Sequence, residues 1–346
     1  MAQAIQSPGT LVPAYNNKTE GIITMGLKRL IKGTLLVGAL ILAPFTSSHA
    51  DYRIGVSVPA ADHGWTAGLL WWAQKAADDL GKKYPDTEFF VVAANSGTRQ
   101  VADVEDLMVK QIDALVILPH NPATLQQVIS EAYDSGIYTV VVDRELETPA
   151  QDVFIAGDNA GMGREAAKYM AEQMDGSGNV IVIEGMPIPI NAQRVNAFNE
   201  VMAKHPDIKI LDSQPSDWSP QKALRVMENL LRKHRDVDAV WAGDDDVLKA
   251  VMQAIEEAGR DDIKLVVGGG GSKDVIGMIK DDHPVVKATV TYPPSMVASA
   301  IALANTGVRG NNLGDMYHHV PARIVLGAEL ITEDNAKDFY VEDAAY

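Results

Sequence analysis

Several side chains in this sequence are of the types that recognise a hydroxyl-rich small molecule. Carboxylates accept hydrogen bonds from hydroxyl groups, and arginine forks donate hydrogen bonds to hydroxyl oxygens. Flat aromatic rings can cover the apolar C–H faces of the same molecule, and small-molecule sites generally combine apolar walls with a few placed polar groups. The candidate ligand-binding residues of these types are Asp62, His63, Trp65, Asp143, Arg144, Arg194, Trp218, Asp244 and Tyr292.

Short apolar runs that alternate with helical patterns must position these residues. The predicted strands span residues 52–59, 88–94, 114–118, 138–142, 153–156, 180–184, 208–213, 239–241, 265–267 and 285–290. The predicted helices span residues 66–83, 100–111, 123–135, 161–174, 192–203, 221–233, 246–258, 273–280 and 296–305. Apolar strands separated by helices predict parallel sheets covered on both faces. These strands are more than one open sheet usually holds. The sequence therefore predicts an α/β fold of two doubly wound lobes.

In doubly wound sheets, ligands bind beyond the carboxyl ends of the strands, where the loops converge. The candidate residues cluster just after the predicted strands, and we therefore expect them to meet in one cleft. Each also has a purely structural alternative. Trp65 and Trp218 could be core aromatics at helix starts, Asp143 and Asp244 could cap helices, and Arg194 could be a surface ion-pair partner.

The first 50 residues differ from the rest of the sequence. A basic segment at 25–32 precedes an apolar run at 33–43, and Ser48-His49-Ala50 gives the small-residue pattern of a cleavage site. The apolar run is too short to span a bilayer as a mature helix, although an N-terminal anchor is the alternative. We expect residues 1–50 to be a leader with a signal peptide at about 25–50, cleaved near Ala50 to release the protein into the periplasm.

The remaining composition narrows the function classes. The net charge is −16, and removal of the basic leader would make the chain more acidic, which argues against nucleic acid or anionic lipid as a partner. There are no cysteines, so disulfides and thiol chemistry are excluded.

The motifs that could carry a cofactor, a metal or catalysis do not have the required form. Gly161–Ala166 lacks the strand and acidic residue of a dinucleotide site, and adjacent His318 and His319 do not form a metal pair. Neighbouring arginines are expected to hold Asp143 and Asp244 ionised, which leaves no acid for a glycosidase pair. We expect no catalytic residue, no cofactor and no metal.

Five motifs in order along the chain carry a specific resemblance. They are VVDRE around Asp143, IAGDN at 155–159, NAQRVNAF at 191–198, PSDWSPQKA at 215–223 and WAGDDD at 241–246. From about Tyr52 to at least Val325, the chain resembles the periplasmic ribose- and galactose-binding protein family, the substrate-binding components of carbohydrate ABC importers. The resemblance implies the type I periplasmic binding protein fold, two lobes joined by three crossovers.

The resemblance also implies roles for the candidate residues. Trp65 and Trp218 would contact the two faces of the ligand, whereas Asp143, Arg144 and Arg194 would hydrogen-bond its hydroxyl groups. This sequence departs from the family pattern at three positions. Asp244 stands where the family has Asn, Tyr292 where it has a Gln near the hinge, and Gly270 where it has the Asp of a G-x-D-G segment. The lost carboxylate is partly offset by Asp244. We therefore expect an alditol or another pentose-like compound rather than ribose, with pentoses, hexoses and alditols as the candidate classes.

The resemblance further implies how the chain divides and what it serves. The expected lobes are residues 51–157 with 292–322, and 158–291 with 323–346, with crossovers near 157–159, 290–293 and 321–326. Hinge closure around the ligand would create the surface that an inner-membrane ABC permease recognises, and we expect a monomer. The alternatives are a periplasmic sensor that feeds a chemoreceptor or sensor kinase, and an exported carbohydrate-active enzyme.

Overall fold

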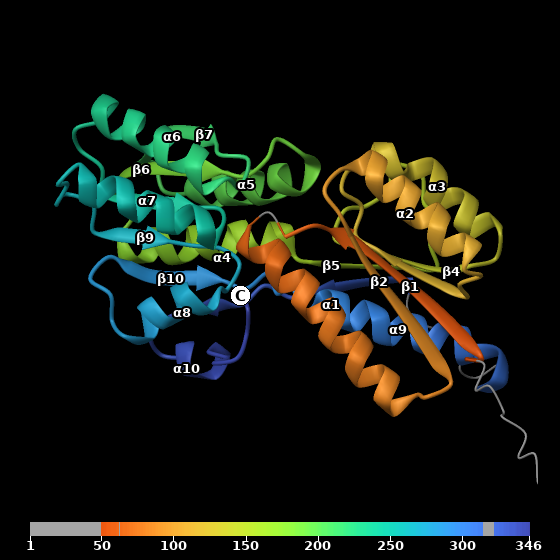
Figure 1. Cartoon of the computed structure of the whole chain (residues 1–346). Helices are drawn as coiled ribbons and strands as arrows, with labels where there is room; N and C mark the ends of the chain where they lie inside the picture. The colour runs from red at the N-terminus through yellow and green to blue at the C-terminus, as the bar shows by residue number, and fades with distance from the viewer. Residues whose placement is uncertain (1–49, 62, 314–321) are drawn as a thin grey trace, which may run out of the picture. The chain divides into compact units, whose positions relative to one another are not determined.

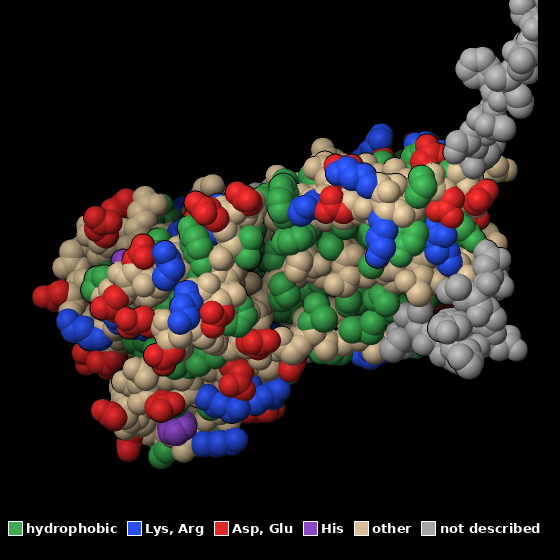
Figure 2. Space-filling view, turned by 90° about the horizontal axis from the view of Figure 1, so that it is seen from below, with side chains coloured by type: hydrophobic (Ala, Val, Ile, Leu, Met, Phe, Trp, Pro, Cys, Tyr) green, Lys and Arg blue, Asp and Glu red, His purple; other side chains and the backbone are tan. Residues whose placement is uncertain are grey.

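The structure is a computed structural model that describes residues 50–61, 63–313 and 322–346. The expected signal peptide lies outside the described residues except for Ala50, and Asp62 also lies outside them. Of the helices within the described residues, none combines the length and the apolar character that a membrane crossing requires. Acidic and basic side chains are interspersed on the face seen in Figure 2.

The first lobe is built on a parallel sheet with the strand order β11-β5-β4-β3-β1-β2 (Figure 1). Its strands are β1 (Tyr52–Pro59), β2 (Thr87–Ala94), β3 (Ala114–Ile117), β4 (Tyr138–Val142), β5 (Val153–Gly157) and β11 (Arg323–Leu326). The central strands β3 and β4 are buried almost throughout. Their uninterrupted apolar sequences follow from this position, because both faces of the sheet are covered by helices.

Two pairs of helices cover this sheet. They are α1 (Gly64–Lys83) with α9 (Met296–Leu313), and α2 (Gly97–Val109) with α3 (Pro122–Asp134). Leu69 of α1 and Ile301 of α9 share one buried cluster with Val116 of β3. Leu107 of α2 belongs to a second cluster with Ile117, the next residue of β3. Because successive strand residues point to opposite faces, the two helix pairs lie on opposite faces of the sheet.

The second lobe repeats this design with the strand order β12-β10-β9-β8-β6-β7. Its strands are β6 (Ser177–Glu184), β7 (Asp207–Pro215), β8 (Ala239–Ala242), β9 (Leu265–Val267), β10 (Val286–Val290) and β12 (Leu330–Ile331). All neighbours are parallel except β12, which pairs with β10 in the antiparallel direction.

The helices of the second lobe again cover both faces of its sheet. They are α4 (Asn159–Gln173), α5 (Pro189–Met202), α6 (Pro220–Lys233), α7 (Asp245–Glu257), α8 (Lys273–Lys280) and α10 (Ala336–Phe339). Phe198 of α5 stacks on Trp241 of β8, with ring centroids 4.2 Å apart and planes 5° apart. Met227 of α6 and Val251 of α7 pack on the opposite face in a separate cluster.

Caps set where several of these helices begin. The side chains of Ser96, Asn121 and Ser219 accept hydrogen bonds from backbone N–H groups in the first turns of α2, α3 and α6. Pro122 and Pro220 then occupy the first turns of α3 and α6, where proline's missing N–H costs no helical hydrogen bond. The sequence therefore ends each preceding loop at a defined residue, and the loop before α6 carries Trp218 of the cavity.

Over the residues that the structure describes, the chain passes between the lobes three times. It crosses from β5 to α4, from β10 to α9, and from β11 to β12 through residues 327–329. The crossings are bonded to one another. The N–H of Asp158 donates to the carbonyl oxygen of Leu326 at 2.8 Å, and the N–H of Thr291 donates to that of Glu329 at 2.9 Å.

The expected α/β fold of two doubly wound lobes is confirmed, but one boundary was wrong. We expected residues 323–346 to belong to the second lobe, whereas β11 pairs with β5 in the first sheet. The third crossover therefore follows β11 instead of preceding or including it. The strands β11 and β12 and the helix α10 were not predicted. In β11 exposed and half-buried positions alternate at the edge of the sheet, unlike the buried central strands.

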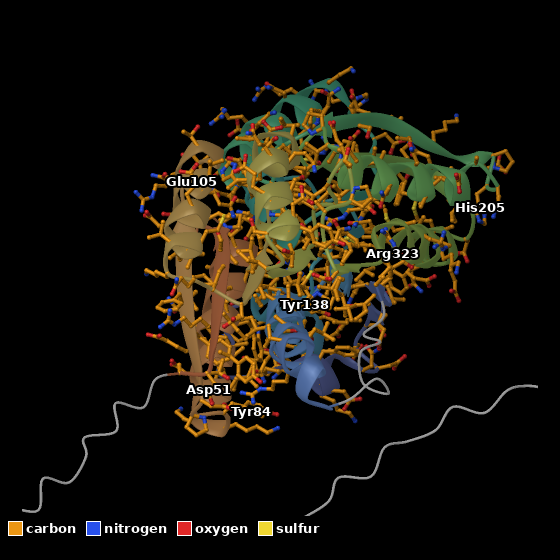
Figure 3. The ribbon with its side chains drawn as sticks, turned by 90° about the vertical axis from the view of Figure 1, so that its right-hand side faces the viewer. Asp51, Tyr84, Glu105, Tyr138, His205 and Arg323 are labelled. Atoms are coloured by element: carbon orange, nitrogen blue, oxygen red, sulfur yellow. The ribbon has the colours of Figure 1, made fainter. Side chains whose placement is uncertain are left out.

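The carboxyl ends of the strands in both sheets point toward the crossings, where the loops carrying the candidate residues converge. Asp51 and Tyr84 mark the opposite end of the first lobe, just before β1 and β2 (Figure 3). There the N–H of Asp51 donates to the carbonyl oxygen of Asp86 at 2.8 Å.

The stacked pair in the second lobe gives a test of its core. We expect Phe198→Ala to lower the free energy of unfolding by about 3–5 kcal/mol, because it removes a fully buried ring and leaves a cavity against Trp241. Urea unfolding followed by circular dichroism measures the change. The control Val109→Ala removes a side chain that is 82% exposed and should change the value by no more than about 0.5 kcal/mol. Equal stabilities of the two variants would contradict this packing.

Candidate functional site

One cavity joins the loops of both lobes and encloses about 370 Å³ of space, including its mouth. Nine of the ten candidate residues line it, and the tenth, Asp62, lies outside the described residues. The nine are His63, Trp65, Asp143, Arg144, Arg194, Trp218, Asp244, Gly270 and Tyr292. The expectation of a common cleft is therefore met by the geometry, while binding of a ligand there remains a prediction. Met162, Ile190 and Gly269 complete the lining.

A buried chain of hydrogen bonds links the two lobes at one wall of the cavity. Tyr292 lies on the crossing after β10, and its hydroxyl donates to Oδ1 of Asp143 in the first lobe at 2.5 Å. The side-chain amide of Asn159 donates to the same hydroxyl at 3.1 Å, and its oxygen accepts from Nε of Arg194 at 2.7 Å. The guanidinium of Arg194 also lies over the Tyr292 ring, 4.3 Å from its centroid.

Electrostatics keep the Tyr292 hydroxyl protonated. Burial, together with the negative charge of Asp143, raises the pKa of the Tyr292 hydroxyl far above its usual value. The phenol therefore remains a hydrogen-bond donor over the whole physiological pH range. Sequence reasoning missed Asn159, which sits at the start of α4 and connects Tyr292 to Arg194. The available signal was its place at the end of the IAGDN motif, shortly after β5.

Arg144 is anchored on the first lobe beside Asp143. Its Nη1 donates to the carbonyl oxygens of His120 at 2.5 Å and Pro119 at 3.2 Å. Its Nε lies 3.8 Å from Oδ2 of Asp143, and this buried nitrogen has no hydrogen-bond partner among the described residues. Asp143 itself has a left-handed backbone, with φ of 63°, which directs the loop after β4 toward the cavity.

The two tryptophans contact different neighbours. The indole N–H of Trp65 donates to the carbonyl oxygen of Tyr292 at 2.8 Å, and the two rings are 6.0 Å apart at an angle of 40°. Trp65 therefore packs against a crossing and lines the cavity at the same time. Trp218 follows β7 in a turn where it and Asp217 both have left-handed backbones, with φ of 56°. Its ring lies 5.8 Å from the guanidinium of Arg194.

Asp244 lines the cavity and also takes the structural alternative, a helix cap. Its Oδ1 caps α7, accepting from the N–H groups of Asp246 at 2.9 Å and Val247 at 3.1 Å. Burial raises its pKa to about 7, the charges of Asp246 and Asp245 add to the increase, and Arg194 opposes it only weakly. The expectation that arginines keep this carboxylate fully ionised was therefore wrong, because desolvation outweighs one neighbouring cation.

The next residue, Asp245, holds the glycine segment in place. Its carboxylate is fully buried and accepts from the N–H of Gly269 at 2.9 Å, the N–H of Ser272 at 2.6 Å and the hydroxyl of Thr289 at 2.8 Å. Burial raises its pKa. The run 268–271 is therefore a loop fixed by one carboxylate. It presents backbone rather than a carboxylate side chain to the cavity.

A direct hydrogen bond spans the two lobes at the start of α1. The backbone N–H of Gly64 donates to Oδ2 of Asp246 in α7 at 2.7 Å. The same carboxylate is paired with Lys249 at 2.9 Å. A carboxylate at a helix N-terminus also interacts favourably with the helix dipole. Sequence reasoning missed this contact because its partners are 182 residues apart and neither belongs to a motif for cleft closure.

Within the described residues, no group of three or more His, Asp or Glu side chains is placed to hold a metal ion. A cavity between two hinged α/β lobes, lined by aromatic rings, carboxylates and guanidinium groups, defines a two-lobed binding protein for small polar solutes. The chain belongs to the periplasmic binding protein family, since the family model described as "Periplasmic binding protein domain" matches residues 54–312. The resemblance found in the sequence is thereby confirmed.

Individual relatives are sugar- and polyol-binding proteins rather than enzymes. The ribose import binding protein RbsB of Bacillus subtilis (strain 168) is 30% identical over 248 residues, which are 71% of this chain and 78% of that protein. The xylitol-binding protein of Mycolicibacterium smegmatis is 27% identical over 84% of this chain and 80% of its own length. A crystal structure of an ABC transporter solute-binding protein from Mycobacterium smegmatis with bound glycerol has a TM-score of 0.75 and 28% identity, and covers 85% of this chain and 98% of that one.

The raised pKa of Asp244 predicts a pH dependence of stability. Below the unfolded-state pKa of 3.8, Asp244 is protonated in both the folded and the unfolded protein. Between pH 3.8 and its folded-state pKa of about 7, the carboxyl group stays protonated in the folded protein but is ionised in the unfolded protein. The free energy of unfolding of the wild type should therefore fall relative to that of Asp244→Asn by up to about 1.4 kcal/mol per pH unit between these values. An asparagine side chain at position 244 can still accept the capping hydrogen bonds of α7.

Urea unfolding at several pH values between 4 and 7 measures this difference. The control is Asp281→Asn, because that carboxylate is exposed and should give a profile parallel to that of the wild type. A parallel profile for Asp244→Asn as well would mean that Asp244 ionises normally in the folded protein.

Proposed function

We propose that this protein is a periplasmic receptor that binds a small polyol, either an alditol or a pentose-like sugar, and delivers it to an ABC permease in the inner membrane. The observation that carries the proposal is that recognition groups from both lobes line one cavity. A ligand between them can touch all of these groups only when the lobes are closed. It therefore favours the closed form by its difference in affinity for the two forms.

The chemistry of the walls supports a hydroxyl-rich ligand. Trp65 and Trp218 offer apolar surfaces to C–H groups, and Arg144 and Arg194 offer N–H donors. Asp143 and Asp244 offer acceptors, although each already receives hydrogen bonds from the protein. A ligand hydroxyl can satisfy both kinds of partner because it donates once and accepts twice.

Two relatives and the glycine loop support a small alditol. One relative is named for xylitol, and one structural neighbour holds glycerol. Where the sequence has Gly270, no carboxylate is available to pair with a further ring hydroxyl. We therefore propose tetritols and pentitols ahead of hexoses.

A thermal-shift screen of pure compounds tests this function. The panel contains tetritols, pentitols, pentoses, hexoses and inositols, each at several concentrations. A true ligand stabilises the folded protein by RT ln(1 + [L]/Kd), so the melting temperature should rise with its concentration. The compound should also be recovered unchanged after incubation. Absence of a shift with every compound, or conversion of any compound by the protein, would reject the proposed function.

Two cavity variants test the site itself. We expect Trp65→Ala and Arg194→Ala each to abolish the ligand-induced thermal shift, because each removes a recognition group from a different lobe. Both variants should remain folded by circular dichroism. Arg225→Ala is the matched control, since this arginine is exposed on α6 and does not line the cavity. Shifts of wild-type size in both cavity variants would show that the ligand binds elsewhere.

The proposal includes export of the chain with removal of residues 1–50. When the full-length sequence is expressed in a Gram-negative host, we expect the protein in the periplasmic fraction to begin at Asp51. N-terminal sequencing of that fraction measures this directly. Replacement of Lys28 and Arg29 by glutamate should retain the protein in the cytoplasm, because the signal peptide needs a basic segment. Periplasmic protein that still carries residues 25–50 would contradict the expected cleavage.

A further inference from the structure

The segment after α10 brings Tyr346 back from the second lobe to Gly270, a residue that lines the cavity. Tyr346 is only 9% exposed and belongs to the same buried cluster as Trp65 and Tyr292. Figure 1 marks this end of the chain close to α1. A Cβ atom at Gly68 of α1 would lie 2.6 Å from Cβ of Tyr346, so a side chain at position 68 would displace it. The glycine in the first lobe therefore makes room for the tyrosine.

A second glycine, in the opposite lobe, accommodates the other end of the same side chain. Gly270 lines the cavity and has a φ of 129°, which other residues rarely adopt. A Cβ atom at this position would overlap the hydroxyl oxygen of Tyr346, and its next neighbours would be ring carbons at 3.3 and 3.5 Å. The phenol thus ends at Gly270, in the place that a side chain on this loop would otherwise occupy.

The hydroxyl of Tyr346 is buried and has no hydrogen-bond partner among the described residues. Leaving such a group unpaired is unfavourable, so it marks a position where a bound molecule can supply the partner. Burial and the negative charges of Asp244, Asp245 and Asp246 raise the pKa of this hydroxyl well above its usual value, and Arg194 opposes the increase. The group is therefore a neutral O–H donor beside a cavity wall that contains Asp244 and Arg194.

We propose that Tyr346 is a specificity-determining residue of the ligand site. Its hydroxyl donates a hydrogen bond to a terminal hydroxyl group of the bound polyol beside Gly270, and its ring limits the length of ligand that the cavity accepts at this end. The proposal rests on the proposed function and assigns the recognition of one end of the ligand. It also explains why the loop 268–271 carries no side chain there, because the tyrosine supplies the polar group in its place.

Isothermal titration calorimetry with the tetritol or pentitol that gives the largest thermal shift tests this inference. We expect Tyr346→Phe to raise Kd about tenfold, which corresponds to one lost hydrogen bond. The melting temperature of the unliganded protein should stay equal or rise slightly, because a buried unpaired hydroxyl is removed. Tyr340→Phe is the matched control, since this tyrosine precedes the same segment but packs under Lys280 on α8 and should leave Kd unchanged.

A second variant tests the limit on length. Tyr346→Ala opens the end of the cavity and should move the preference toward an alditol at least one carbon longer. A Kd of wild-type size in Tyr346→Phe overturns the proposal even if Tyr346→Ala fails to fold. If the wild type binds no compound of the panel, it is the proposed function that fails. If the wild type binds and Tyr346→Phe binds equally well, only the role of Tyr346 is rejected.

Discussion

Burial of charge between two lobes is the constraint on which this structure depends. A carboxylate and a guanidinium in a closed cavity are costly unless each has partners, and the pair Asp143 and Arg194 is linked through Tyr292 and Asn159. Because Tyr292 lies on a crossing between the lobes, the same hydrogen bonds support the hinge and orient the candidate binding residues. Side chains held in place in this way reduce the cost of ordering a site on binding.

Three consecutive aspartates illustrate how one loop serves several purposes. Asp244 caps α7 and faces the cavity, Asp245 fixes the glycine loop, and Asp246 reaches across to Gly64 of the other lobe. Burying a carboxylate is costly, and at Asp244 the charges of Asp246 and Asp245 add to that cost. The raised pKa values of Asp244 and Asp245 reflect that cost, which the hydrogen bonds to backbone N–H groups partly offset.

The sequence predicted most of the fold and most of the cavity lining, because both follow local rules. Apolar runs between helices predicted the ten strands β1 to β10, and the rule that ligands bind at the carboxyl ends of strands brought Trp65 and Trp218 together. The strand β11 was not predicted; it is an edge strand whose positions are exposed or half-buried. The contacts of Tyr346 with Gly68 and Gly270 depend on the tertiary path of the last segment, which no local pattern encodes.

The hydrogen bond between Gly64 and Asp246 joins the lobes directly, so its contribution to closure does not pass through a ligand. Each 1.4 kcal/mol that such a contact contributes multiplies the ratio of closed to open unliganded molecules by about ten. The ligand then needs to supply less free energy to complete closure, and the apparent affinity rises. The same bias lowers selectivity, because a partner protein that recognises only the closed form also meets closed molecules without a bound ligand.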